Sequence, residues 1–322
     1  MTDSNLPRSD AATAGTPRRR GCGAMVVHRR LLNESPDYRL ARSELENRTI
    51  AFLAERRVSR FQGIARVPVV VHVVYRNAQQ NISDDQVRSQ IEVLNLDYRA
   101  QNADTSIVPD GFSGKIADSR LEFFLATTDP DGNPTQGITR TNTRLASFTT
   151  DDRVKSSATG GADPWPTDRY LNIWVCQLGG GLLGYAQFPG GPAETDGVVI
   201  LNTGFGTTGT AAAPFDLGRT TTHEVGHFFN LFHIWGDDGT GCGGTDEVDD
   251  TPNAAGPNFG VPTFPHITCG NGPDGDLFYD FMDYTDDRGM VMFTEGQAAR
   301  MEACIDSIRS SLVQLEPVAA PA

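Results

Sequence analysis

The sequence lacks two features that would define broad classes of protein. No apolar run approaches the roughly 18 residues of a membrane-spanning helix, so we expect no membrane span. Positive charge is also in deficit, with 27 Lys and Arg against 41 Asp and Glu and a formal net charge of −14. Because binding to phosphate needs clustered basic side chains, nucleic acid is excluded as the expected partner.

Cysteine is scarce, and its placement bears on the compartment. Cys22 follows a polar stretch, residues 1–20, that is typical of disorder. An even number remains without it, as a disulfide framework needs. An oxidising, extracytoplasmic location is therefore favoured, although no ordinary signal peptide is visible. These remaining cysteines are Cys176, Cys242, Cys269 and Cys304.

The hydrophobic pattern predicts an α+β protein with strands and helices first and an irregular part later. Apolar alternation and Val-rich runs predict strands at 65–76, 120–126, 170–176 and 196–202. Helical spacing predicts helices at 36–58, 83–98, 218–232 and 294–313. Residues 236–280 are rich in Gly, Asp and Pro and are expected to be irregular. Two subdomains with a cleft between them would follow, a common place for a site.

Three of the six histidines fall within residues 223–233, HEVGHFFNLFH. His223 and His227 are four residues apart, so on a helix both rings project from one face and can hold one metal ion. Glu224 follows the first histidine, where its carboxylate can reach a metal-bound water. The alternative is a set of ordinary buried or surface histidines, which an isolated motif of this kind leaves open.

His233 cannot join the other two if the helix continues. It would lie roughly 9 Å further along the axis than His227, whereas zinc–nitrogen bonds are about 2.0–2.1 Å long. The helix must therefore stop, and the chain must turn back. A left-handed residue allows this turn, and Asn tolerates that conformation best after Gly. Asn230 stands at that position, so we expect one zinc ion on three histidines with a fourth position open.

With these residues on view, the sequence resembles the metzincin zinc peptidases, in the version used by the pappalysin family. The motif HEVGHFFNLFH has Asn230 where the family usually has Gly, and FMDYTDD at 281–287 resembles the family's Met-turn. The resemblance covers roughly residues 20–313. It implies a zinc-dependent endopeptidase acting on proteins or peptides, with a mixed sheet, an active-site helix and an irregular lower part ending in a helix. We expect a monomer.

The resemblance also implies roles for individual residues. Glu224 is the general base, Met282 forms an apolar floor beneath the zinc ligands, and Tyr284 hydrogen-bonds the tetrahedral intermediate. The segment 181–189 is similar to an edge strand on which an extended substrate pairs through its backbone. Gly184 and Tyr185 are the expected substrate-binding residues of this segment.

Cys22, in RRRGCGA, resembles a cysteine switch, in which a propeptide thiolate occupies the open zinc position. The alternative is a spectator thiol in a flexible tail. Residues 1–60 are then a propeptide and 61–322 the catalytic domain. Its upper subdomain spans about 61–233 and its lower subdomain about 234–322.

Two further kinds of site are implied by the resemblance. Cys242 and Cys269 match positions that are paired in the family, which leaves Cys176 and Cys304 as a second pair; the alternative is four buried thiols. The family binds calcium near residues 243–252, where oxygen ligands are dense; the alternative is an acidic turn without metal. The candidate calcium ligands are Asp246, Asp249, Asp250 and the Thr251 carbonyl.

Asp287, five residues after Met282, matches an Asp at the base of the S1′ pocket of ulilysin-like members. The resemblance implies a preference for Arg, or Lys, just after the scissile bond, because a desolvated carboxylate pairs with a guanidinium and rejects apolar side chains. The alternative is that Asp286 and Asp287 bind calcium or cap a turn. Self-processing could then occur in the stretch 54–66, for example before Arg60. The arginines of this stretch are Arg56, Arg57, Arg60 and Arg66.

Two other functions compete with an active peptidase. One is an inactive homologue that binds proteins through the same cleft, and the other is a calcium-dependent adhesion module with an incidental zinc site. The presence of Glu224 and of all three histidines favours the enzyme.

Overall fold

The computed structural model describes residues 17–55 and 63–315. A seven-stranded mixed sheet forms its centre, with strand order β2-β1-β4-β6-β5 and with β3 and β7 also paired to β1. All pairs are parallel except β5 with β6 and β7 with β1. The strands are β1 (Ala65–Tyr75), β2 (Leu121–Leu125), β3 (Ile138–Asn142), β4 (Leu171–Cys176), β5 (Gly184–Ala186), β6 (Val198–Leu201) and β7 (Gln314–Leu315).

The central strands are apolar on both faces because both faces are covered. β1 reads ARVPVVVHVVY and is buried over nearly its whole length, as expected for a parallel strand in a covered sheet. β4 and β6 are buried throughout. The short strand β5 runs antiparallel to β6 at the edge of the sheet, and its outer side pairs with the segment around Cys22.

The described residues form six α-helices, and local capping fixes several of their starts. Ser83 accepts from the Gln86 amide at the start of α3, and Thr294 with Gln297 forms a capping box at the start of α6. The α-helices are α1 (Ala24–Glu34), α2 (Pro36–Ala54), α3 (Asp84–Tyr98), α4 (Asp110–Ser113), α5 (Arg219–Phe228) and α6 (Glu295–Ser307). Single 3-10 turns are Ala103–Ile107, Arg153–Lys155, Ser157–Thr159, Ala193–Thr195 and Asn202–Gly204.

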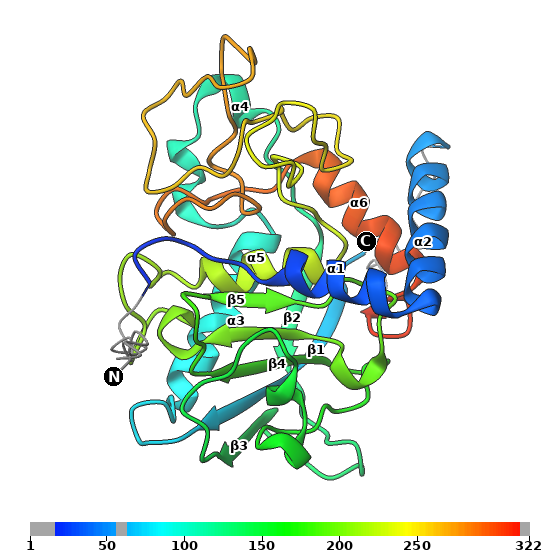
Figure 1. Ribbon diagram of the computed structural model, residues 1–322, viewed down its shortest axis with the longest axis vertical. Coiled ribbons are helices and arrows are strands. Elements are labelled where there is room, and N and C mark those ends of the chain that lie inside the picture. The colour runs from blue at the N-terminus through cyan, green and yellow to red at the C-terminus, as the bar shows by residue number, and fades with distance from the viewer. Residues whose placement is uncertain (1–16, 56–62, 316–322) are drawn as a thin grey trace, which may run out of the picture.

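Figure 1 shows two parts with α5 between them. The sheet lies on one side of α5, and a loop-rich part, with α4, lies on the other. Between α5 and α6 the chain forms no helix or strand over residues 229–294. α1 crosses in front of β5 and α5, while α2 packs along α6.

Sequence reasoning missed α1, β3 and the short elements α4 and β7, and it extended two helices too far. α1 was missed because its residues follow a polar tail, although Ala24, Val27 and Leu31 are buried at helical spacing. β3 reads ITRTN and is only half buried, so its pattern is weak. The closing helix ends at Ser307 and the zinc-motif helix at Phe228, earlier than expected. Within residues 17–55 and 63–315, no helix is both long and apolar enough to span a membrane.

Candidate active site

α5 carries the first two motif histidines and stops where the spacing argument requires. The helix ends at Phe228, and Asn230 adopts a left-handed conformation with φ of 79°. The Leu231 amide then donates to the Gly226 carbonyl over 3.0 Å, a bond that reverses the chain after a helix. His233 is thereby brought back beside His227 rather than being carried onward.

The three histidine rings converge through their Nε2 atoms. The Nε2 atom of His227 lies 3.2 Å from that of His223 and 3.1 Å from that of His233. The Nδ1 atoms face acceptors at 2.7–2.8 Å: the carbonyls of Phe281 and Leu231 and the carboxylate of Asp237. Because these acceptors fix the protons on Nδ1, three Nε2 lone pairs point at one another.

This arrangement fits a zinc ion. Lone pairs at such distances repel unless a cation lies between them, and two zinc–nitrogen bonds at a tetrahedral angle span about 3.3 Å. Burial lowers the pKa of His223 and of His227 well below the usual value, so both rings are neutral, as metal ligands must be. The Asp237 carboxylate behind His233 is the outer partner that orients such ligands.

Glu224 lies beside the histidines on α5, with its carboxyl between the helix and β5. Burial raises its pKa to about 8, close to the range in which a general base works best. Gly184 makes room for it, because a Cβ there would come within 2.8 Å of the Glu224 carboxyl.

The Met-turn lies directly beneath the zinc helix. A Cβ on Gly226 would lie 2.5 Å from the Met282 sulfur, so Met282 packs against the helix between the two histidines. The ring of Tyr284 lies 4.9 Å from that of His233 and 5.8 Å from that of His223. Its hydroxyl therefore reaches the same space as the Nε2 atoms.

The described start of the chain fills this space. The ligand atoms of Cys22, His223, His227 and His233 all lie within 4.8 Å of one another. The Cys22 thiol donates to Glu224 over 3.3 Å, and the Cys22 amide donates to the Tyr284 hydroxyl over 3.3 Å.

The same segment pairs with the β5 edge. The Gly23 amide donates to the Gly184 carbonyl over 2.9 Å, and the Leu183 amide donates to the Gly21 carbonyl over 2.8 Å, in a parallel bridge. The Tyr185 side chain points into the core and is fully buried. Of the two residues expected to bind substrate, Gly184 thus offers backbone groups, and Tyr185 presents no side chain to this side.

Asp287 is buried and meets a guanidinium from the chain itself. Arg20 Nη2 lies 2.6 Å from Asp287 Oδ1, and both side chains are at most 1% exposed. The other carboxylate oxygen accepts the amides of Leu217 and Arg219 at 2.8 and 3.3 Å. Asp287 therefore contacts the guanidinium of Arg20 through one carboxylate oxygen only, because backbone amides occupy the other.

Further contacts complete the Arg20 site. Its Nε donates to the Thr285 carbonyl over 3.1 Å, and its Nη1 donates to the Thr220 hydroxyl over 3.1 Å. The guanidinium carbon lies 5.0 Å from the centre of the Phe215 ring. An arginine side chain is thus recognised by charge, by hydrogen bonds and by an aromatic face together.

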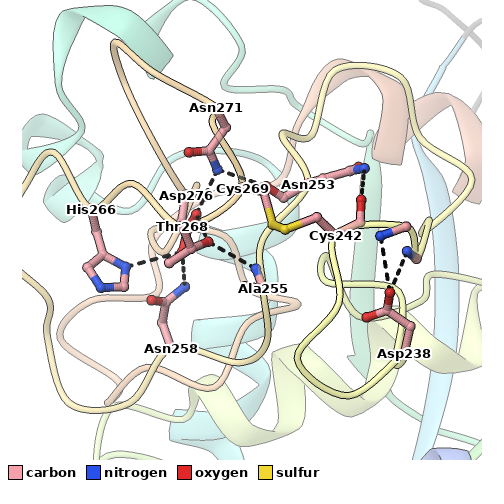
Figure 2. Close-up of a disulfide and its surroundings, with 12 residues drawn as sticks. Asp238, Cys242, Asn253, Ala255, Asn258, His266, Thr268, Cys269, Asn271 and Asp276 are labelled. Carbon is pink, nitrogen blue, oxygen red and sulfur yellow. Dashed lines mark hydrogen bonds and ion pairs between the residues drawn. A yellow bond between two sulfur atoms is a disulfide. The ribbon is translucent and has the colours of Figure 1, made fainter.

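Of the two predicted disulfides, one is present and the other is absent, so the second prediction is wrong. Cys242 and Cys269 are bonded, joining two loops of the loop-rich part (Figure 2). Cys176 and Cys304 are both free, buried thiols. They cannot pair because Cys176 lies on β4 in the sheet core, whereas Cys304 lies on α6 near the guanidinium groups of Arg309, Arg42 and Arg300.

The candidate calcium ligands have hydrogen-bonding partners instead of converging on one point. Asp246 accepts from the Thr251 hydroxyl at 2.8 and 2.9 Å. Asp250 accepts from the Thr294 hydroxyl and the Gly296 amide at the start of α6. In the described part of the chain, the histidine cluster is the one group of metal-ligand side chains gathered closely enough to hold an ion.

Sequence reasoning missed the supports of this site. Asp97 on α3 pairs with Arg219 and accepts from the Thr222 hydroxyl over 2.6 Å, which fixes the first turn of α5. On the other side, Asn258 donates to the Asp283 carboxylate. Both depend on contacts far apart in the sequence, so no local pattern could reveal them.

Comparison with known proteins agrees with the site. The profile of the peptidase family described as pregnancy-associated plasma protein-A matches residues 153–306. An extracellular metalloprotease of Arthroderma benhamiae is 34% identical over 77% of this chain and 74% of its own length. A second extracellular metalloprotease, from Pyricularia oryzae, is 31% identical over 90% of this chain and 89% of its own length.

Solved structures show the same similarity. Promirolysin of Tannerella forsythia superposes with a TM-score of 0.84 and 46% identity, covering 91% of this chain and 97% of that one. Mature mirolysin of Tannerella forsythia, in complex with a cleaved peptide, superposes with a TM-score of 0.77 and 51% identity. The match covers 78% of this chain and 96% of that one.

The fold and the histidine site define a metzincin-type zinc metalloendopeptidase. The chain belongs to the pappalysin family, whose members are described by the pregnancy-associated plasma protein-A profile.

Proposed function

We propose that this chain is the latent precursor of a secreted zinc endopeptidase that cleaves proteins just before Arg or Lys. Residues 1–60 would be its propeptide and 61–322 its catalytic domain. One observation carries the proposal: Cys22 Sγ lies among the histidine Nε2 atoms while Arg20 pairs with Asp287. A chain that places a thiol at the metal position and an arginine in a buried pocket beside it blocks both parts of a peptidase site.

The residues around the histidines divide the reaction between them. Zinc, when bound, supplies a Lewis acid that polarises water and the scissile carbonyl. Glu224 takes the proton of the attacking water and passes it to the leaving amine. The Tyr284 hydroxyl, which touches Cys22 here, donates a hydrogen bond to the tetrahedral intermediate. The β5 edge at Gly184 binds the substrate backbone.

The Arg20 site supports selection of a basic residue after the scissile bond. Arg20 is two residues from Cys22, so its side chain enters the protein immediately beside the reaction centre. Asp287 would be left as an unpaired buried carboxylate by an apolar substrate, at a cost of about 1–3 kcal/mol or more. This penalty favours Arg and Lys over every neutral side chain.

Activation requires cleavage after α2. Arg56, Arg57 and Arg60 lie outside the described residues, between α2 and β1, and are the candidate positions for self-processing. Arg66 is a poor candidate because it lies within β1, with its guanidinium 4.7 Å from the centre of the Phe124 ring. The expectation of disorder in residues 1–20 is wrong for its last residues, because Arg20 is buried and pairs with Asp287. Residues 1–16 lie outside the described residues.

Secretion is supported by the names of the relatives, which are extracellular metalloproteases. We also propose a monomer. A structural calcium ion near Asp246, Asp249, Asp250 and Thr251 is proposed as well, and it would require Asp246 and Asp250 to exchange their present hydrogen-bonding partners for the ion. Calcium binding would raise the melting temperature and would be reversed by a calcium chelator.

Purified full-length chain in zinc buffer tests the proposal. We expect self-processing, cleavage of casein that a chelator abolishes, and cuts before Arg or Lys in a peptide library. The variant Cys22→Ala should mature at least roughly tenfold faster, equivalent to about 1.4 kcal/mol of lost binding. As the control, Cys22→Ala combined with Glu224→Ala should not mature at all. Unchanged maturation of Cys22→Ala would contradict the switch, and absence of any cleavage would favour an inactive homologue.

A further inference from the structure

We propose that Phe259 is a second specificity residue: an aromatic platform that selects a second basic side chain directly after the Arg that follows the scissile bond. The preferred substrates would then be proteins with consecutive basic residues. This inference rests on the proposed function, because it takes Arg20 to stand in for the first of these residues.

The observation is a contact made by the residue next to Arg20. The guanidinium carbon of Arg19 lies 5.1 Å from the centre of the Phe259 ring, within the range of a cation–π interaction. Phe259 remains 38% exposed even with Arg19 over it. An aromatic side chain that stays accessible at the edge of the site can receive the same kind of group from a substrate.

Hydrogen bonds hold the backbone on both sides of Phe259. On one flank, the Asn258 amide nitrogen and side-chain nitrogen each donate to one oxygen of Asp283, both over 2.8 Å. On the other flank, the Asp286 amide donates to the Gly260 carbonyl over 2.8 Å. The platform is thus tied at both ends to the segment that carries Tyr284 and Asp287.

A second layer of contacts supports Asn258 (Figure 2). Its amide also lies 3.4 Å from the buried carboxylate of Asp276. Asp276 accepts from the Thr268 hydroxyl and the Asn271 amide, both over 2.7 Å, next to the disulfide at Cys269. A platform fixed in advance loses little conformational freedom on binding, which favours even a single cation–π contact.

The order of residues along the segment identifies the subsite. Cys22 lies at the histidines, Arg20 fills the adjacent pocket at Asp287, and Arg19 lies further out. In a substrate, the residue directly after the scissile bond would enter the Asp287 pocket. A substrate would pass these subsites in the opposite chain direction, because its basic residues follow the scissile bond whereas Arg19 and Arg20 precede Cys22. Its second basic residue, further from the reaction centre, would therefore reach Phe259.

The inference makes a choice among the arginines available for self-processing. Arg56 is followed by Arg57, whereas Arg60 is followed by Phe61. These residues lie outside the described part of the chain, so the choice rests on the sequence and on the Phe259 platform alone. Cleavage before Arg56 is therefore expected in place of cleavage before Arg60.

The test compares peptides that share one sequence up to the first Arg and differ only in the next residue, which is Arg, Lys, Ala or Leu. The full-length chain is used after it has matured in zinc buffer, and kcat/KM is measured for each peptide. Arg should exceed Ala by roughly two- to fivefold, the size of an exposed cation–π contact. In Phe259→Ala this ratio should fall to near one, while in Phe259→Tyr it should persist.

Val261→Ala is the matched control, because Val261 is exposed two residues away and should leave the ratio unchanged. Equal rates for Arg and Ala in the wild type would overturn the inference, although cleavage before the first Arg would still support the proposed function. A Leu peptide as good as the Arg peptide would also overturn it, because the subsite would then be merely apolar. Both outcomes are measured on the wild-type protein. The inference can therefore be disproved even if a variant fails to fold.

Discussion

The two sides of the active site are built in different ways. The sheet side consists of β5 and α5, whose regular backbone hydrogen bonds place Gly184, Glu224 and two histidine ligands. The loop side consists of residues 258–260 and 282–287, which contain no helix or strand and are held by buried carboxylates. In the proposed function, the sheet side positions the reaction and the loop side selects the side chain. Loops can therefore change specificity while the scaffold keeps the chemistry.

The largest effect is expected on the sheet side, from Glu224→Ala. Removing Glu224, the proposed general base, should lower kcat by roughly 10³–10⁴-fold, because the group that takes the proton of the attacking water is lost. Zinc content should stay at one ion per chain, since Glu224 is not among the converging ligands. Kinetics on a peptide substrate and metal analysis of the same sample check both statements. Near-normal turnover would contradict the division of roles between the two sides.

A smaller and more selective effect is expected on the loop side, from Asp287→Leu. Cleavage before Arg should fall by roughly 10²-fold, because charge-assisted hydrogen bonds to the guanidinium are lost. The control Asp287→Asn keeps an acceptor for the Leu217 and Arg219 amides while removing the charge. Both variants should lose the preference for Arg over neutral residues, with zinc content unchanged. An unaltered preference in Asp287→Asn would show that charge is not what selects Arg.

The same contrast explains how much the sequence could predict. On the sheet side, the spacing of His223, His227 and His233 required a turn at Asn230, and its φ is 79°. Regular elements follow local patterns, so local reasoning succeeds there. On the loop side, Met282, Tyr284 and Asp287 were found only through family resemblance.

The supports of the loop side were missed entirely. Asn258 and Asp276 act through partners 25 and 18 residues away, or through short loops around a disulfide. In a region rich in Gly and Pro, the sequence does not indicate which Asn or Asp side chains will be buried. The incorrect pairing of Cys176 with Cys304 has the same origin, because it relied on counting the cysteines without knowing which layer each occupies.

Asn258→Ala tests whether buried polar contacts hold the loop side. Burial raises the pKa of Asp283 to about 7, so this carboxyl depends on the two hydrogen bonds from Asn258. Losing the side-chain donor should cost about 2 kcal/mol of stability, and calorimetry should show a melting temperature lower by roughly 4–8 °C. The sheet-side control is Thr221→Val, which removes one hydrogen bond to Gln90 on α3 and should cost about 1 kcal/mol. Equal losses of stability in the two variants would contradict the idea that the loop side depends more on buried polar contacts than the sheet side does.

The last expected effect appears only at acid pH, and it concerns how protonation loosens the N-terminal segment from the sheet side. His28 on α1 is buried against Phe188 and bonded to the Tyr38 hydroxyl over 2.7 Å. Burial, followed by the charges of Arg42 and Arg29, lowers its pKa from 6.5 to about 4, while Asp237 acts in the opposite direction. Packing therefore favours the neutral ring.

The sign of the effect follows from the direction of this shift. Once the segment is released, His28 takes up a proton below about pH 6.5, whereas the packed ring resists protonation down to about pH 4. Binding of the segment is thus unaffected above pH 6.5 and weakens as the pH falls between these values, by at most about 3 kcal/mol. Hydrogen exchange of α1 in the Glu224→Ala chain, which cannot cut itself, should show roughly 30-fold more opening near pH 5 than in Glu224→Ala with His28→Phe. Because both chains share the same intrinsic exchange rates elsewhere, their ratio isolates the histidine. A ratio that stays constant between neutral pH and pH 5 would mean that His28 does not titrate on release, and that the hold on the sheet side is independent of pH.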